Sequence, residues 1–226
     1  SSPLKRAAAT TENILKNLKG KIEPIFDENL LEVDLDDWSG KKIDELERSF
    51  PEAFKIWQDN PRNLEITKTN GEKYRPIQEL IDQARNFINT LIQDHHNKNN
   101  STTVIVAHNA ILRCLLLVLL GEPNNGFRRI KLDNASISVI NLDIHKKDKF
   151  KCQIECLNNT THLNNNLPKK GNYSRIILVR HGETDWNLQG RFQGQIDIPL
   201  NKNGKEQGAC AGSFLSNEQL DKAYSS

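Results

Sequence analysis

Two short apolar runs, each ending at a histidine, most strongly constrain how this 226-residue chain can fold. Residues Thr102–Ala107 precede His108, and residues Arg175–Val179 precede the triplet Arg180-His181-Gly182. Their nearly continuous β-branched and apolar character is typical of strands that are covered on both faces. Segments with helical patterns follow both runs. We therefore expect a layered α/β fold with catalytic loops at the carboxyl ends of its strands.

The rest of the chain shows further helical and strand patterns. A serine and a proline at the start of the chain favour a helix that begins near Leu4 and ends before Gly20. Further strands are expected at Lys21–Phe26, Arg129–Leu132, Ser136–Leu142 and Phe150–Cys156, and further helices at Ile43–Ser49, Pro51–Gln58, Tyr74–Gln93, Ala110–Leu120 and Asn203–Leu215. Residues 158–174 are rich in Asn, Pro and Lys, which indicates a linker.

Length and charge exclude several classes of protein. A chain of this length supports one well-buried domain, and its net charge of +2 gives no basic face for nucleic acid or membrane. The longest apolar run, Cys114–Leu120, is far shorter than the roughly 20 residues that span a bilayer. The four cysteines have scattered spacings, which predicts reduced thiols, a cytoplasmic protein and no metal site.

The residues around His181 suit phosphoryl transfer. That reaction needs a nucleophile, cations or N–H donors around the phosphoryl oxygens, and an acid for the departing oxygen. An imidazole is substantially neutral at pH 7, so His181 could attack phosphorus without a strong base. The planar guanidinium of Arg180 suits a phosphate, and Gly182 leaves room for close backbone approach.

The sequence from Leu178 to Asn187, followed by Gly190–Leu200, resembles the opening signature of the phosphoglycerate-mutase-like histidine phosphatases. The resemblance implies a three-layer α/β/α fold with a mostly parallel central sheet. It also implies that His181 takes up a phosphoryl group without metal or cofactor. The residues that would line the phosphate pocket here are Arg180, Asn187, Gln193 and Gly194.

Three other segments are similar to parts of the same family. Ser1–Ala7 resembles a serine-rich turn, which makes Arg6 the second phosphate ligand, and Leu30–Gly40 resembles the segment with the proton donor, aligned with Glu32. Val104–Ala110 resembles the segment of a second phosphate-pocket histidine, here His108. Simpler alternatives are a surface arginine at position 6, a solvated glutamate at 32 with Asp34 as rival acid, and a core histidine at 108.

The match departs from the family at three positions. Asp36 and Asn109 stand where the family usually has glycine, and Ser39 stands where it often has glutamate. Asp36 could weaken the fit of the loop that carries the acid. Asn109 tolerates left-handed backbone better than most residues, so a turn at that position is expected to survive.

The family segments occur here in a rotated order. Residues 1–157 resemble the C-terminal portion of a histidine phosphatase domain, and residues 175–226 resemble the N-terminal portion, which contains the Arg-His-Gly triplet. One explanation is a circular permutant that closes into a single domain. The other is the junction of two tandem domains, which the absence of methionine favours. The expected partner of the chain is therefore a second copy, in a homodimer, or a tandem partner domain.

We expect a phosphomonoesterase that hydrolyses small phosphorylated metabolites through a phosphohistidine. Two alternatives stay open. The first is a phosphoglycerate mutase, which returns the phosphoryl group to a sugar acid instead of to water. The second is an inactive domain that binds phospho-ligands or serves as a partner.

Overall fold

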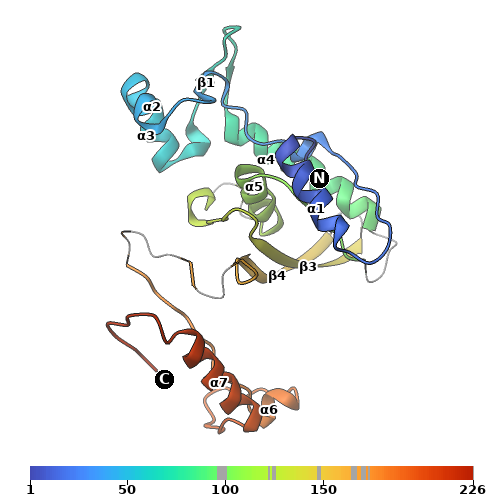
Figure 1. The fold of residues 1–226 in the computed structure, drawn as a ribbon, viewed down its shortest axis with the longest axis vertical. Helices are drawn as coiled ribbons and strands as arrows, with labels where there is room; N and C mark the ends of the chain where they lie inside the picture. The colour runs from blue at the N-terminus through green and yellow to red at the C-terminus, as the bar shows by residue number, and fades with distance from the viewer. Residues whose placement is uncertain are drawn as a thin grey trace. The chain divides into compact units, whose positions relative to one another are not determined.

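The structure of the protein is a computed structural model that describes residues 1–95, 101–121, 123, 126–146, 149–163, 167–168, 172 and 174–225. The chain divides into two compact units, Ser1–Asn159 and Thr160–Ser226, and each is described by itself (Figure 1). Much of the expected linker at 158–174 lies outside the described residues.

The first unit is mainly helical. Its α-helices are α1 (Lys5–Lys16), α2 (Ile43–Ser49), α3 (Pro51–Asp59), α4 (Pro76–His95) and α5 (Asn109–Leu119). Short 3₁₀ helices lie between them at η1 (Glu28–Leu30), η2 (Asp36–Trp38), η3 (Pro61–Asn63) and η4 (Phe127–Arg129). The helices predicted from the sequence in this unit are confirmed, with ends that differ by about two residues.

The main core of this unit forms where α4 packs against α5, which lie side by side in Figure 1. Helix α4 places Ile77, Ile81, Ala84 and Ile88 on one face because residues three or four apart share a side of a helix. From α5, Ile111, Cys114 and Leu115 complete the contact. Burial of these side chains holds α5 in place, and α5 positions the residues described below.

A second cluster connects α2 and α3 to a small sheet. Trp38, Leu46, Phe54, Leu64, Ile66 and Tyr74 are all buried there. The Trp38 ring lies 6.4 Å from the Phe54 ring and 6.5 Å from the Trp57 ring. Because Trp57 also packs against the main core, it joins the two clusters. The Tyr74 hydroxyl donates to the Asp34 carbonyl at 2.8 Å, which satisfies its polar end.

The sheets of the described residues are two-stranded and antiparallel. Strand β1 (Ile66–Thr67) pairs with β2 (Lys73–Tyr74), and β3 (Ile137–Lys146) pairs with β4 (Lys149–Asn159). In the larger hairpin, Val139 pairs with Cys156 and Leu142 with Cys152. The strands predicted at Ser136–Leu142 and Phe150–Cys156 are therefore confirmed, and both extend beyond their predicted ends.

Four other predicted strands are not strands in the structure: Lys21–Phe26, Thr102–Ala107, Arg129–Leu132 and Arg175–Val179. An apolar run becomes a strand only when neighbouring strands supply ladder hydrogen bonds, and sequence pattern cannot supply those neighbours. The two runs expected to be buried are instead open to solvent: Val104 is 61% exposed and Leu178 is 90% exposed. These ranges are corrections to the prediction.

The second unit contains α6 (Asp185–Leu188) and α7 (Lys202–Phe214), and the predicted helix at Asn203–Leu215 is thus confirmed. A β-bridge joins Thr184 to Leu200. The loop after His181 packs against the first turn of α7 so closely that a side chain at Gly182 would overlap the Gly204 backbone. Glycine is therefore required at position 182 for steric reasons.

The second unit has almost no interior. Thr184 and Gly204 are the buried residues in its described part, and no apolar side chain there is buried. Ile176 is 84% exposed and Phe192 is fully exposed.

The described helices and the cysteines bear on membrane insertion and on disulfide bonding. None of the described helices is long and apolar enough to cross a membrane. Each of the four cysteines is a free thiol, and burial raises the pKa of Cys114 to about 12.

We predict that Ile81→Ala, in the α4 face of the main core, lowers the free energy of unfolding of the first unit by about 2–5 kcal/mol. Ile81 is 1% exposed, so the truncation leaves a cavity. Urea unfolding followed by circular dichroism measures the change. The matched control is Ile43→Ala in α2, where the side chain is 70% exposed and a change within about 0.5 kcal/mol is expected. Equal effects would contradict the packing described here.

Candidate active site

His108 lies at the N-terminal end of α5 and contacts residues from the start of the chain. The Arg6 Nε–H donates to His108 Nδ1 at 3.0 Å, across 102 positions of sequence. His108 Nε2 lies 2.9 Å from the Ser2 hydroxyl oxygen. Because Nδ1 accepts from a guanidinium that has no lone pair to offer, the proton of the neutral ring is on Nε2, which donates to Ser2. The neighbours of His108 therefore select one neutral tautomer.

The electrostatic surroundings of His108 also favour its neutral form. The side chain is buried, and burial is the main cause that lowers its pKa. The positive charge of Arg6 lowers the pKa further, while the negative charge of Glu32 opposes both effects. His108 is thus a hydrogen-bonding group near neutral pH, not a cation.

Ser2 ties the chain start to the segment before α5. It is fully buried, and its backbone N–H donates to the Val106 carbonyl at 2.9 Å. Ser2 was expected to lie in a serine-rich turn at the start of a helix, and no part in the site was predicted for it. The signal that could have identified it was this turn, whose hydroxyls lie within reach of a histidine only in the folded chain.

The Glu32 carboxylate lies at the same end of α5. Its Oε1 accepts from the Ala110 N–H at 3.1 Å and the Ile111 N–H at 3.2 Å. These are orphan donors of the first helical turn, where the helix dipole also favours negative charge. Glu32 is half-buried, whereas the rival acid Asp34 is exposed and accepts from the Asp36 N–H at 3.0 Å. Glu32, and not Asp34, therefore shares a location with His108.

The two positions where the family usually has glycine differ in conformation. Asp36 has a φ of 41°, in the left-handed region that favours glycine, and its carboxylate accepts from the Thr69 N–H at 2.8 Å. That bond helps to hold the acidic loop against the segment after β1. Asn109 instead begins α5, so the expected left-handed turn at this position is wrong; its side chain donates to the Leu132 carbonyl at 2.8 Å.

Arg113 lies one turn further along α5. Its Nε is buried and has no hydrogen-bond partner within the part of the chain that the structure describes. Its guanidinium lies 5.2 Å from the centre of the Phe127 ring. Burial lowers the pKa of Arg113, and the nearby Glu32 charge opposes that shift. Arg113 therefore places a positive charge near the Glu32 carboxylate.

His181 lies in an exposed loop of the second unit. Its Nδ1 is 2.7 Å from the Gly182 carbonyl oxygen. A carbonyl oxygen can only accept, so Nδ1 carries the proton of the neutral ring and the lone pair lies on Nε2. The local backbone thus selects the tautomer in which Nε2 is the nucleophilic nitrogen.

The other predicted phosphate ligands of this unit lie in the cap of α6, in a later turn and directly before His181. The Asn187 side-chain oxygen Oδ1 accepts from the Thr184 N–H at 3.1 Å and from the Thr184 hydroxyl at 3.0 Å, as part of the cap of α6. Gln193 and Gly194 form a turn in which the Gln193 carbonyl accepts from Ile196 N–H at 3.1 Å. Arg180 is exposed beside His181.

The structure thus brings Arg6, Glu32 and His108 together in the first unit. The predicted residues Arg180, His181, Asn187, Gln193 and Gly194 belong to the second unit. Among the described residues, no group of three or more His, Cys, Asp or Glu side chains is arranged to hold a metal ion.

The chain belongs to the histidine phosphatase superfamily (branch 1), whose family model matches residues 1–159 and 176–226. The protein named "Probable 2-carboxy-D-arabinitol-1-phosphatase" from Arabidopsis thaliana is 33% identical over 190 residues, which are 81% of this chain and 36% of that protein. The 2-carboxy-D-arabinitol-1-phosphatase of Triticum aestivum is 28% identical over 222 residues, 95% of this chain and 42% of that protein. The chain therefore spans less than half the length of these relatives.

A solved structure supports the α/β fold class. Bacillus stearothermophilus YhfR superposes with a TM-score of 0.58 at 23% sequence identity, over 72% of this chain and 73% of that chain. At this identity the likeness concerns the fold alone.

We predict that the first unit loses stability as the pH falls below about 6.5, the usual pKa of an unfolded-chain histidine. The pKa of His108 is lower in the folded chain, so between the two values the unfolded chain binds more protons than the folded chain. The contribution is fully present above pH 6.5 and is lost as the pH falls toward the folded value.

Urea unfolding of the wild type and of His108→Gln at pH 7.5 and 5.5 measures this loss. The wild type should lose more unfolding free energy than the variant between the two pH values. His162→Gln, at an exposed histidine, is the control and should behave as the wild type. An equal loss in wild type and His108→Gln would contradict the assignment.

Proposed function

We propose that the chain is part of a phosphatase that hydrolyses small phosphorylated metabolites through a phosphohistidine on His181. The observation that carries this proposal is the cluster at the N-terminus of α5, where Arg6, His108 and Glu32 meet. A guanidinium, a neutral imidazole and a carboxyl group are the parts that phosphate binding and leaving-group protonation require. The curated relatives, named as phosphatases of a sugar-acid phosphate, support a small phosphorylated substrate.

In the proposed reaction His181 Nε2 attacks phosphorus and the bond from phosphorus to the substrate oxygen breaks. Arg180, Arg6 and His108 stabilise the phosphoryl oxygens, together with Asn187, Gln193 and Gly194. Glu32 gives a proton to the departing oxygen. It then takes a proton from the water that attacks the phosphohistidine, which releases inorganic phosphate and restores both residues. The negative charge on the phosphoryl group is offset by side chains, so the reaction needs no metal.

The proposed reaction uses residues of the kinds found in both units, so the arrangement of the domain decides whether one chain or two copies supply them. The alignment with the wheat relative covers 95% of this chain and 42% of that protein. An alignment of that extent includes both units, so the relative has the two portions in the same order, with more than half of its length outside the alignment. This favours the tandem-domain hypothesis. In that hypothesis residues 1–157 form the end of one histidine phosphatase domain, residues 158–174 are the linker, and residues 175–226 form the start of the next domain.

The mostly parallel central sheet belongs to the same proposal. The apolar runs at 102–107 and 175–179 carry exposed side chains, among them Val104, Ile176 and Leu178, of the kind that a sheet covered on both faces would bury. The second unit lacks an apolar interior in its described part, so burial of these side chains in a sheet would add most to its stability.

The four free thiols support a cytoplasmic location. The proposed partner is a tandem domain or a second copy of the chain.

We predict that labelled phosphate from a small phosphoester is trapped on the wild-type chain under alkaline denaturing quench, and that His181→Ala traps none. Removing the nucleophile should lower kcat at least about a thousandfold. His162→Ala, at an exposed histidine, should leave trapping and kcat unchanged.

With 3-phosphoglycerate as substrate, release of inorganic phosphate without 2-phosphoglycerate indicates a phosphatase, and formation of 2-phosphoglycerate indicates a mutase. A folded chain that neither traps a phosphoryl group nor hydrolyses any phosphoester would contradict the phosphatase and the mutase hypotheses. It would indicate a domain that only binds phospho-ligands.

We predict that Glu32→Gln lowers kcat about 10²–10⁴-fold for an alkyl phosphate, whose leaving oxygen needs a proton. The loss should be much smaller for p-nitrophenyl phosphate, because nitrophenolate leaves without protonation. Asp34→Asn removes the exposed rival carboxylate and should leave both rates near the wild-type values. Equal losses for the two substrates would show that Glu32 acts in structure and not as the acid.

A further inference from the structure

A cavity of about 220 Å³ lies in the first unit at the opposite end of α5 from His108. Its apolar floor includes Ile77 and Ile81 from α4 and Leu117 from α5. Leu117 is nine residues beyond His108, about 14 Å along the helix at ~1.5 Å per residue. The cavity is therefore separate from the cluster of Arg6, Glu32 and His108.

Charged side chains complete the lining of this cavity. The lining residues include three arginines, Arg62, Arg128 and Arg129, and one acidic residue, Asp59. Guanidinium groups stay protonated at all ordinary pH values, so the charged lining carries more positive than negative charge. Within the described ranges, none of these three arginines forms an ion pair with a carboxylate.

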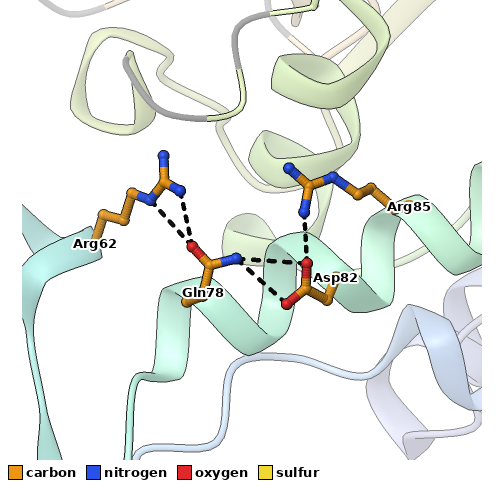
Figure 2. Close-up of polar contacts among 4 residues, drawn as sticks. All are labelled: Arg62, Gln78, Asp82 and Arg85. Atoms are coloured by element: carbon orange, nitrogen blue, oxygen red, sulfur yellow. Dashed lines mark hydrogen bonds and ion pairs between the residues drawn. The ribbon is translucent and has the colours of Figure 1, made fainter.

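Arg62 is held in place by a neutral group. Its Nε and Nη2 donate to the Gln78 side-chain oxygen Oε1 at 3.1 and 2.9 Å, and its third nitrogen points away from Gln78 (Figure 2). The Gln78 amide in turn lies 3.3 Å from an Asp82 oxygen, and Arg85 binds the same carboxylate at 2.5 Å. The Asp82 charge is thus offset by Arg85, which leaves Arg62 fixed in position and not neutralised.

Arg128 is fixed by an aromatic ring and a carbonyl. Its Nε donates to the Trp57 carbonyl at 3.2 Å, its Nη2 donates to the same oxygen, and its guanidinium lies 4.8 Å from the Trp57 ring centre. Burial and then the charge of Arg113 lower the pKa of Arg128. An anion in the cavity would relieve this repulsion between two cations.

The backbone just before these arginines passes close to the end of α5. Gly126, which precedes η4, has a φ of 93°, and a side chain there would lie 3.1 Å from Leu117 Cδ2. Glycine therefore lets the chain turn closely over the end of α5 just before Arg128 and Arg129. Arg129 is exposed.

We propose that this cavity is a binding site for a compact anion, a phosphate or carboxylate group on a small molecule, distinct from the phosphoryl-transfer residues. The guanidinium groups of Arg62, Arg128 and Arg129 would provide charge-assisted donors for its oxygens, and Arg128 and Arg129 are both exposed. The apolar floor accommodates the carbon atoms next to that group. A volume of about 220 Å³ is below the ~300–1,000 Å³ of typical ligand pockets, which restricts the ligand to a small one.

The test is a titration of the ¹⁵N-labelled chain with inorganic phosphate, and separately with acetate, at constant ionic strength set with sodium chloride. The backbone amides of Phe127 and Arg129 report on the cavity, and the Ala110 amide reports on the N-terminus of α5. We expect saturable shifts at Phe127 and Arg129. Phosphate binding tighter than acetate binding would identify a phosphate-bearing ligand, and the reverse would identify a carboxylate.

Two variants and one matched control decide the assignment. Arg62→Gln and Arg129→Gln should each weaken anion binding at Phe127 about tenfold, the effect of losing one charge-assisted bond. Arg48→Gln removes the same charge from an exposed, ion-paired site in α2 and should change nothing.

Phe127 and Arg129 shifts that do not saturate, or that weaken equally in Arg48→Gln, would overturn the proposal. Since Arg129 is exposed, Arg129→Gln keeps the test valid if Arg62→Gln fails to fold. Repeating the titration in His181→Ala separates this site from the proposed catalysis, because the cavity shifts should be unchanged there.

Discussion

The N-terminus of α5 is the constraint on which the first unit's part of the site depends. A helix start leaves backbone N–H groups without partners, and here the Glu32 carboxylate accepts two of them. His108 stands at the residue before the helix, and its ring is oriented by Arg6 on one side and Ser2 on the other. One local requirement, the capping of α5, thus brings an acid, an imidazole and a guanidinium to the same place.

That arrangement holds only because α5 itself is firmly packed. Its buried face, which includes Ile111 and Cys114, lies against the apolar face of α4. The same two helices contribute the floor of the arginine-lined cavity at the other end of α5. A single helix pair therefore supports two clusters of charged groups that are about three helical turns apart. Because the cluster around His108 and the arginine-lined cavity lie at different ends of α5, each can bind a ligand of its own.

The two units differ greatly in how much apolar surface they bury. The first has two buried clusters, whereas the second has, in its described part, no buried apolar side chain. The hydrophobic effect is the main favourable contribution to folding, so a unit that buries little gains stability from contact with other protein segments. The family model matches residues of both units, 1–159 and 176–226.

Much of the helical structure could be predicted from local sequence, because a helix satisfies its own backbone hydrogen bonds. The pattern of Ile77, Ile81, Ala84 and Ile88 identified α4, and Pro51 marked the first residue of α3. Thr102–Ala107 and Arg175–Val179 were predicted to be strands and are not strands in the structure, because a strand exists only through its neighbours, which local sequence does not supply.

The sequence by itself determined the helices, the family and the identity of Arg6, Glu32, His108 and His181 as candidates, since these depend on short motifs and local periodicity. Only the tertiary structure decided that Glu32 and not Asp34 accompanies His108, that Arg6 fixes its tautomer, and that Arg62 and Arg128 line one cavity. These facts depend on contacts between residues that are far apart in the chain, and the distances that create hydrogen bonds and electrostatic interactions are set only when the chain packs.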